Sequence, residues 1–272
     1  MADAGKAIRL ARILGSDGRA TVLAFDHGLQ LGPVEGTEDP GHVLETAVEA
    51  GIDAVLVTPG LLRRFAQMFA GRNKPGILVR MDWSNMWRPV DELGFPEGGT
   101  EPIAAAETAL ALGADAVLGY QFLGLADPDA ELRNVRSTAA WIEAGHKLGL
   151  PVAIEPMISR RHPPDTVFRA DLVAMHVRMV TEMGVDLIKT DYTGDAESFR
   201  RVIDATWVPV LAAGGAWTDP ARTEEDARQI IASGAAGVFF GRRLFQAPDM
   251  GEVVRRIASV VHGVPAKSGL HV

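Results

Sequence analysis

The 272-residue sequence contains no cysteine, which excludes disulfide bonds, thiolate zinc sites and cysteine nucleophiles. Positive charge is also scarce: 27 lysines and arginines stand against 35 aspartates and glutamates, for a formal net charge of −8. Nucleic-acid binding normally needs a basic surface, so we expect no nucleic-acid partner. An anionic small ligand remains compatible with this composition, because a pocket can be locally positive in an acidic protein.

Long hydrophobic runs are absent too. No stretch reaches the roughly 20 apolar residues that a membrane span needs, so we expect no membrane association. Residues 1–15 carry Lys6, Arg9 and Arg12 among their apolar positions, which predicts a short amphipathic helix rather than a signal peptide. A cytoplasmic protein is the resulting expectation.

Short aliphatic runs, typical of strands buried on both faces, recur eight times along the chain. They are Ala20–Phe25, Asp53–Val57, Ile77–Arg80, Ala116–Gly119, Val152–Ile154, Asp186–Lys189, Val210–Ala212 and Gly237–Phe240.

Helix signals separate these runs. Three helices are expected to begin at a capping residue near a proline and to end before a glycine. They run from Asp39-Pro40 to Gly51, from Thr100-Glu101-Pro102 to Gly113, and from Asp127-Pro128 to Gly149. Four later helices are expected over Arg169–Met183, Ala196–Thr206, Thr223–Ser233 and Pro248–Val261.

Eight strand–helix units favour an α/β fold with a single (β/α)8 TIM barrel spanning residues 1–272. An open doubly wound sheet usually carries a G-x-G-x-x-G turn after its first strand, whereas this first strand ends in Asp26-His27-Gly28. Residues 82–100 form the longest irregular stretch, which predicts a loop over the site. Residues 265–272 are expected to form a C-terminal tail.

In such barrels the chemistry lies at the C-terminal ends of the strands. The residues that follow the eight runs are Asp26, Thr58, Asp82, Tyr120-Gln121, Glu155, Lys189, Gly214-Gly215 and Gly241-Arg242. Three carboxylates, one lysine and two glycine turns are therefore expected on one rim.

Lys189 ends the run Val-Asp-Leu-Ile-Lys. Because side chains alternate along a strand, Lys189 points into the barrel if Ile188 packs against the helices. Burial disfavours the charged form of an amine, and a neutral amine can attack a carbonyl to form a Schiff base. The alternative is a lysine that is solvated at the rim or paired with Asp191.

The turns after the last two strands are candidates for phosphate binding, because glycine lets an oxyanion approach the backbone N–H groups. They comprise Ala213, Gly214 and Gly215 after the seventh strand, and Gly241 and Arg242 after the eighth. Tight turns that simply need positive φ are the alternative explanation.

Two carboxylates are acid–base candidates, Asp26 and Glu155. A helix cap is the alternative role for Asp26, and an ion pair with Arg160 or Arg161 is the alternative for Glu155. His27, the one histidine at a strand end, and Tyr192 are candidates for substrate binding. The spacing of histidines and carboxylates predicts no metal site, and we expect no cofactor.

The stretch Asp186–Ala247, with its K-x-x-Y-T-G-D motif from Lys189, resembles the archaeal-type class I fructose-bisphosphate aldolases. The wider family includes deoxyribose-phosphate and tagatose-bisphosphate aldolases. Asp26-His27-Gly28 and the segment Asp53–Pro59 belong to the same pattern, and the similarity covers nearly the whole chain. The resemblance implies that Lys189 is the Schiff-base lysine and that Asp26 assists near the imine. It also implies a homo-oligomer, often rings of five paired into decamers.

One motif departs from that family. The archaeal fructose-bisphosphate enzymes carry Trp-x-Tyr at the end of the fifth strand, where this sequence has Glu155-Pro156-Met157. The Glu-Pro pair is similar to tagatose-bisphosphate and sulfofructose-phosphate aldolases, in which a glutamate on this strand moves the proton. The resemblance therefore assigns the proton transfer to Glu155.

Together these features predict a metal-independent lyase that cleaves or forms a C–C bond in a phosphorylated sugar through an imine on Lys189. It would release an aldehyde and a ketone similar to dihydroxyacetone phosphate. Alternatives are a transaldolase-like synthase or a thiolase that uses the same lysine, and a non-lyase phosphosugar-binding barrel.

Overall fold

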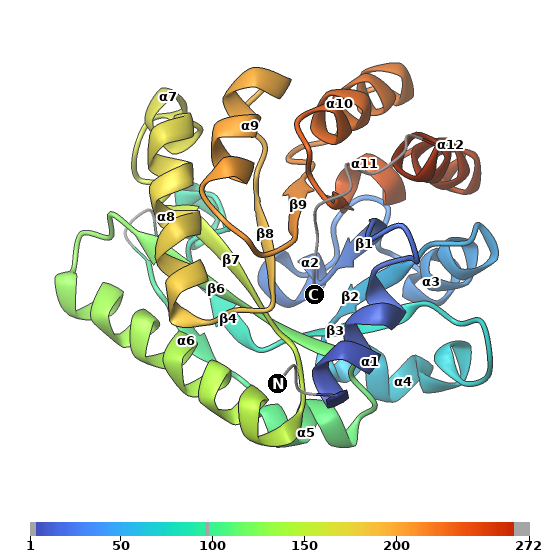
Figure 1. Cartoon of the computed structure of the whole chain (residues 1–272), viewed down its shortest axis with the longest axis horizontal. Coiled ribbons are helices and arrows are strands. Elements are labelled where there is room, and N and C mark those ends of the chain that lie inside the picture. The colour runs from blue at the N-terminus through green and yellow to red at the C-terminus, as the bar shows by residue number, and fades with distance from the viewer. Residues whose placement is uncertain (1–3, 96–97, 264–272) are drawn as a thin grey trace.

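Eight parallel strands close into a barrel surrounded by helices, which confirms the predicted (β/α)8 fold (Figure 1). The computed structural model describes residues 4–95 and 98–263, so the expected tail at 265–272 lies outside the described residues. Around the barrel the strand order is β1, β10, β9, β8, β7, β6, β3 and β2. The strands are β1 (Ala20–Phe25), β2 (Ala54–Val57), β3 (Gly76–Arg80), β6 (Ala116–Leu123), β7 (Val152–Ile158), β8 (Leu187–Asp191), β9 (Val210–Ala213) and β10 (Gly237–Phe240).

The helices fall largely where the capping signals place them. Asp39 caps its helix by accepting a hydrogen bond from the His42 N–H, and Gly149 ends another in the left-handed region at φ 61°. The helices are α1 (Ala4–Ile13), α2 (His27–Leu31), α3 (Pro40–Glu49), α4 (Pro59–Phe69), α5 (Ala106–Ala111), α6 (Pro128–Leu148), α7 (Pro164–Val167), α8 (Ala170–Met183), α9 (Ala196–Asp204), α10 (Pro220–Ala232), α11 (Arg242–Phe245) and α12 (Met250–His262).

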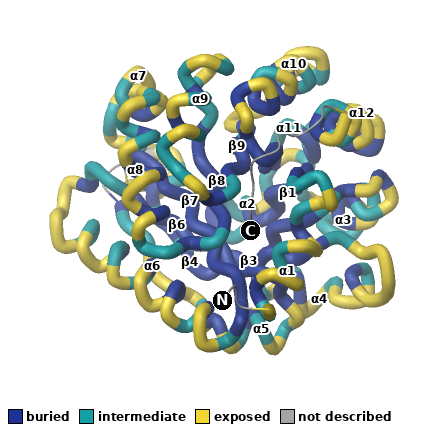
Figure 2. The backbone as a smooth tube through the Cα atoms, in the orientation of Figure 1, coloured by how far each residue is buried: buried dark blue, intermediate teal, exposed yellow. Residues whose placement is uncertain are grey.

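Alternation along the strands divides the core into two layers. Val22 belongs to an inner cluster inside the barrel, and its neighbour Leu23 belongs to the outer cluster between strands and helices. Ile13 of α1 joins the inner cluster, so this helix closes the N-terminal end of the barrel. Figure 2 shows the buried strands inside a ring of helices whose outer faces are exposed. The opposite, C-terminal end carries a second set of buried polar side chains, among them Asp26, Glu155 and Lys189.

The helix expected from Thr100 is wrong. Thr100–Pro102 forms strand β5, which pairs antiparallel with β4 (Asp82–Ser84), and the helix begins only at Ala106. The Thr100 hydroxyl donates to the Asp82 carboxylate at 3.2 Å or to the Trp83 carbonyl at 3.1 Å. Pairing with a distant strand has thus overridden a local capping signal. Residues 82–100 also include a 3-10 turn, η1 (Val90–Glu92).

Four strands extend beyond their expected ends: β6 runs to Leu123, β7 to Ile158, β8 to Asp191 and β9 to Ala213. Strand β7 continues through Pro156, which has no N–H for a sheet ladder. The ladder between β7 and β8 involves only Ala153 and Ile154 on the β7 side, so Pro156 lies beyond it. Glu155 is consequently in the middle of a long strand rather than at its end.

Candidate active site

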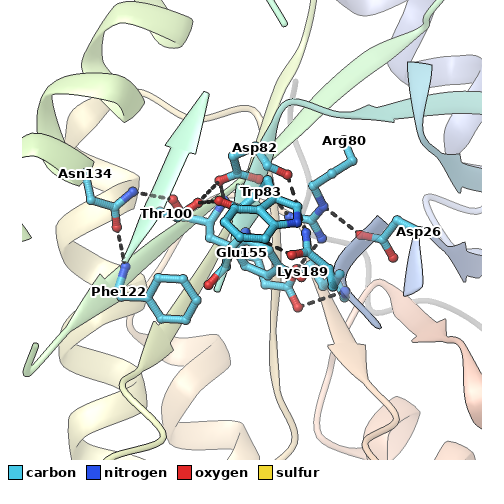
Figure 3. Close-up of polar contacts among 12 residues, drawn as sticks. Asp26, Arg80, Asp82, Trp83, Thr100, Phe122, Asn134, Glu155 and Lys189 are labelled. Carbon is cyan, nitrogen blue, oxygen red and sulfur yellow. Dashed lines mark hydrogen bonds and ion pairs between the residues drawn. The ribbon is translucent and has the colours of Figure 1, made fainter. Parts of the chain in front are cut away.

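Lys189 faces the interior of the barrel. Leu187 lies in the inner cluster and Ile188 in the outer one, as the alternation along β8 requires. The Lys189 side chain is 9% exposed, and its Nζ lies 2.8 Å from Glu155 Oε1 (Figure 3). The ammonium also lies 4.9 Å from the centre of the Phe239 ring. Its ion-pair partner is therefore Glu155 and not Asp191.

Glu155 is held through both carboxylate oxygens. Oε1 pairs with Lys189, and Oε2 accepts a hydrogen bond from an Arg80 NH2 group at 2.8 Å. Arg160, considered above as a partner for Glu155, instead forms two hydrogen bonds with Asp191, at 2.9 and 3.1 Å. A buried carboxylate held between two cations is placed for proton exchange with the lysine beside it.

Asp26 lies at the end of β1, on the other side of Arg80. It occupies the N-cap position of α2, but its side chain makes no capping hydrogen bond. Instead Oδ2 accepts a hydrogen bond from Arg80 Nε at 2.6 Å. Burial raises the pKa of Asp26, but the charges of Arg80 and Lys189 outweigh burial and lower the pKa to about 2. Asp26 is therefore ionised at neutral pH.

Arg80 was not among the residues that sequence reasoning selected. It ends β3, its side chain is fully buried, and it contacts three carboxylates: Asp26, Glu155 and, at 3.4 Å, Asp82. The Tyr120 ring covers the guanidinium, whose carbon lies 3.8 Å from the ring centre. The only local signal was an aspartate of opposite charge two residues further on, at Asp82, and it does not reveal the contacts with Asp26 and Glu155.

Asp82 connects this cluster to the β4–β5 hairpin. Its Oδ2 accepts hydrogen bonds from the Tyr120 backbone N–H at 2.7 Å and from the Thr100 hydroxyl at 3.2 Å. Burial raises the pKa of Asp82 to about 6, and the charge of Arg80 only partly opposes this effect. Asp82 is thus a structural carboxylate that is committed to neighbouring groups.

The two glycine turns follow β9 and β10 and line the same cavity as Lys189. Gly215 has φ +70°, and a Cβ there would meet nothing within 4 Å. Gly241 is packed closely: a Cβ there would lie 2.4 Å from His27 Cε1 and 2.9 Å from the Ala24 carbonyl oxygen. Only glycine can occupy position 241 without displacing the histidine or the β1 backbone.

Arg242 and His27 complete this side of the site. Arg242 Nε and His27 Nδ1 are both buried without a hydrogen-bond partner in the described part of the chain. Burial lowers the pKa of His27, partly offset by Asp26, and burial together with Arg160 lowers the pKa of Arg242. The buried, unpartnered N–H of Arg242 is suited to an anionic ligand.

A cavity of about 160 Å³ brings the predicted site residues together. Its lining includes Asp26, His27, Glu155, Lys189, Ala213, Gly214, Gly215, Gly241 and Arg242, and also Trp87, Tyr120 and Arg160. Among the predicted site residues, Tyr192 is the one that the described lining does not include. It follows the end of β8 and packs against the outer cluster, where its ring lies edge-on to Phe199 of α9 with 5.3 Å between centres.

Metal sites and membrane spans can be considered for residues 4–95 and 98–263, which the structure describes. No group of three histidine, aspartate or glutamate side chains there could hold a metal ion. No helix in the same ranges is long and apolar enough to cross a bilayer.

A TIM barrel with a buried lysine–carboxylate pair in a cavity at its C-terminal end is typical of enzymes that bind carbonyl substrates covalently. A model of the DeoC/LacD aldolase family matches residues 20–247. The chain belongs to this family of carbon–carbon lyases.

Similar proteins agree with this assignment. An uncharacterized aldolase of Saccharolobus solfataricus is 35% identical over 261 residues, covering 95% of this chain and 94% of its own length. A 2-amino-3,7-dideoxy-D-threo-hept-6-ulosonate synthase of Halobacterium salinarum is also 35% identical, covering 96% of this chain and 93% of its own. The crystal structure of an archaeal fructose 1,6-bisphosphate aldolase superposes with a TM-score of 0.82 at 25% identity, covering 95% of this chain and all of that one.

Proposed function

We propose that this protein is a metal-independent class I aldolase that acts on a phosphorylated ketose through a Schiff base on Lys189. The observation that carries the proposal is the buried contact of 2.8 Å between Lys189 Nζ and Glu155 Oε1, inside a cavity lined by two glycine turns. The similarity to an archaeal fructose 1,6-bisphosphate aldolase supports the choice of a phosphorylated sugar.

Imine formation is the first stage. The Lys189 ammonium gives a proton to Glu155, and the neutral nitrogen attacks the carbonyl carbon of the ketose phosphate. Glu155 then returns this proton to the hydroxyl group of the carbinolamine, so that water leaves, a cationic iminium remains and Glu155 is again a carboxylate. Asp26 interacts electrostatically with Lys189, and its pKa of about 2 keeps it negatively charged at neutral pH. Its charge therefore lowers the energy of the iminium cation.

Bond cleavage follows. Glu155 accepts the proton of the hydroxyl group β to the iminium carbon, the C–C bond breaks, and its electron pair moves into the iminium to give an enamine. The aldehyde leaves. A proton returns to the enamine carbon, and water hydrolyses the imine to release a ketone similar to dihydroxyacetone phosphate and the free lysine.

The glycine turns keep the phosphate bound through both stages. Gly215 and Gly241 line the cavity, and the lack of a side chain there lets an oxyanion approach the backbone N–H groups. Arg242 adds a cation whose buried Nε has no hydrogen-bond partner in the described chain. His27 lines the same part of the cavity. Holding the phosphate fixes the carbonyl carbon next to Lys189.

A synthase of the same family is the second candidate, and the Halobacterium salinarum relative favours it. Such an enzyme would join carbon skeletons with the same lysine. The two candidates differ in the carbonyl compound that forms the imine, not in the residue that carries it.

Trapping the imine tests the proposal. We expect dihydroxyacetone phosphate with sodium borohydride to give a reduced adduct on Lys189, located by intact mass and peptide mapping, and unaffected by EDTA. The adduct should be absent from Lys189→Met and present in Lys6→Met, a variant of another buried lysine. Absence of an adduct from the folded wild-type protein would contradict the proposal, and loss of activity with EDTA would contradict its metal-free form.

A further inference from the structure

Arg80 has a different carboxylate on each of its three side-chain nitrogens. Nε donates to Asp26 at 2.6 Å, one NH2 group donates to Glu155 at 2.8 Å, and the other lies 3.4 Å from Asp82. Figure 3 shows the guanidinium between Asp26 and Glu155, with Lys189 beyond Glu155. A planar guanidinium can satisfy several carboxylates in fixed directions, which an ammonium group cannot.

The partners of Glu155 must change during the proposed reaction. A free lysine ammonium has three N–H groups, whereas the iminium formed from it has one. Oε1 of Glu155 must then leave the lysine nitrogen and turn to the substrate hydroxyl. Without a second anchor, the whole carboxylate would be free to rotate at that moment.

We propose that Arg80 is a positioning residue that holds Oε2 of Glu155 fixed while Oε1 exchanges Lys189 for the substrate hydroxyl. This inference rests on the proposed function and assigns to Arg80 a part in it. Arg80 does not touch the substrate, because its side chain is fully buried and does not line the described cavity.

Neighbouring side chains hold the Arg80 guanidinium in place. Tyr120 covers one face of the guanidinium, and the carboxylate of Asp82 is itself held by the Tyr120 N–H and the Thr100 hydroxyl. These groups come from β6, β4 and β5, so three elements fix the position of one side chain. These contacts oppose movement of the guanidinium away from Glu155.

The pH profile separates this role from simple stabilisation. Four charged or titratable groups surround Asp26. They are Arg80 from β3, Lys189 from β8, Glu155 from β7, and His27, which follows Asp26 in the sequence. Burial raises the pKa of Asp26, and the charge of Arg80 is the main influence that lowers it. Removing that charge should move the acid limb of the rate profile to higher pH.

The experiment uses exchange of the substrate C–H in D2O, which needs no aldehyde. Dihydroxyacetone phosphate should incorporate deuterium when the imine loses its α-proton to Glu155. For Arg80→Lys we expect the borohydride adduct to persist and KM to stay within threefold, while kcat for exchange falls about 100-fold, as a misplaced catalytic group implies. Arg80→Met should in addition shift the acid limb upward.

Lys6→Met is the matched control, because Lys6 is a buried cation 2.7 Å from Asp186 at the closed end of the barrel. It should lower the melting temperature and leave exchange unchanged. Arg80→Lys keeps the positive charge and decides the outcome if Arg80→Met does not fold.

Two results would overturn the inference: folded Arg80 variants with wild-type kcat and pH profile, or variants that lose the adduct together with exchange. Failure of the proposed function itself looks different, because the wild-type protein would then form no adduct.

Discussion

Replacing Glu155 with glutamine removes the proton acceptor of the proposed reaction and preserves the volume of the side chain. General acid–base catalysis contributes about 10²- to 10⁴-fold to a rate, which equals about 3–5 kcal/mol of transition-state stabilisation. We therefore expect kcat for deuterium exchange into dihydroxyacetone phosphate to fall by that factor. The amide oxygen can still accept a hydrogen bond from Lys189 or Arg80.

The expected loss of stability is much smaller than the loss of rate. Breaking a buried ion pair costs about 3–5 kcal/mol when it leaves a charge without a partner. Here Arg80 keeps Asp26 and Asp82 after the substitution, and Lys189 keeps its contact with the Phe239 ring. Because both cations keep most of their stabilising contacts, we expect the free energy of unfolding to fall by about 1–2 kcal/mol.

The assay follows exchange in D2O by proton NMR, with urea unfolding and borohydride trapping on the same samples. The same substitution at Glu143, an exposed α6 residue 2.9 Å from Lys147, is the matched control and should leave exchange unchanged. Exchange within threefold of wild type in folded Glu155→Gln would refute the assignment of proton transfer to this residue.

Two further predictions test other parts of the molecule. Gly241→Ala places a Cβ 2.4 Å from His27 Cε1, an overpacking that costs about 1–3 kcal/mol, so KM for dihydroxyacetone phosphate should rise about tenfold or more; an unchanged KM would remove this turn from the phosphate site. His262 lies 3.0 Å from Asp53 and 2.8 Å from Asp17, and mainly the hydrogen bond to Asp53 raises its pKa from 6.5 to about 9. The protonated form stabilises the fold fully below pH 6.5, and this stabilisation is lost as the pH rises through 9. The substitution His262→Gln should therefore lower the free energy of unfolding by about 1–2 kcal/mol at pH 6 and by little at pH 10. Equal losses at both pH values, measured by urea unfolding, would show that the ion pairs contribute nothing.

Alternation of side chains accounts for what the sequence could predict about the site. It places Lys189 inside the barrel from the packing of Ile188 alone, and the structure has this arrangement. The same rule, carried one step further, explains the position of Tyr192. With Lys189 and Asp191 facing inward, position 192 must face the helices, where its ring meets Phe199.

The cluster around Arg80 could not be predicted in the same way. An arginine at the end of an aliphatic run is usually solvated, and its burial here depends on carboxylates that β1, β4 and β7 bring together from distant parts of the chain. The capping signal at Thr100 failed for a related reason, because Asp82 and Trp83 provide hydrogen-bond partners that no local pattern reveals. Long-range polar contacts decide both features.

The three carboxylates around Arg80 differ enough in environment to separate their roles. Asp26, with a pKa lowered to about 2, is a poor base at neutral pH and serves as a fixed negative charge. Asp82 has a raised pKa of about 6, but its oxygens are committed to Arg80, the Tyr120 N–H and Thr100. Glu155 is the one of the three with a hydrogen-bonding contact to the Lys189 nitrogen. These environments support the proposal that Glu155 transfers the proton, by an argument that does not depend on the resemblance to any relative.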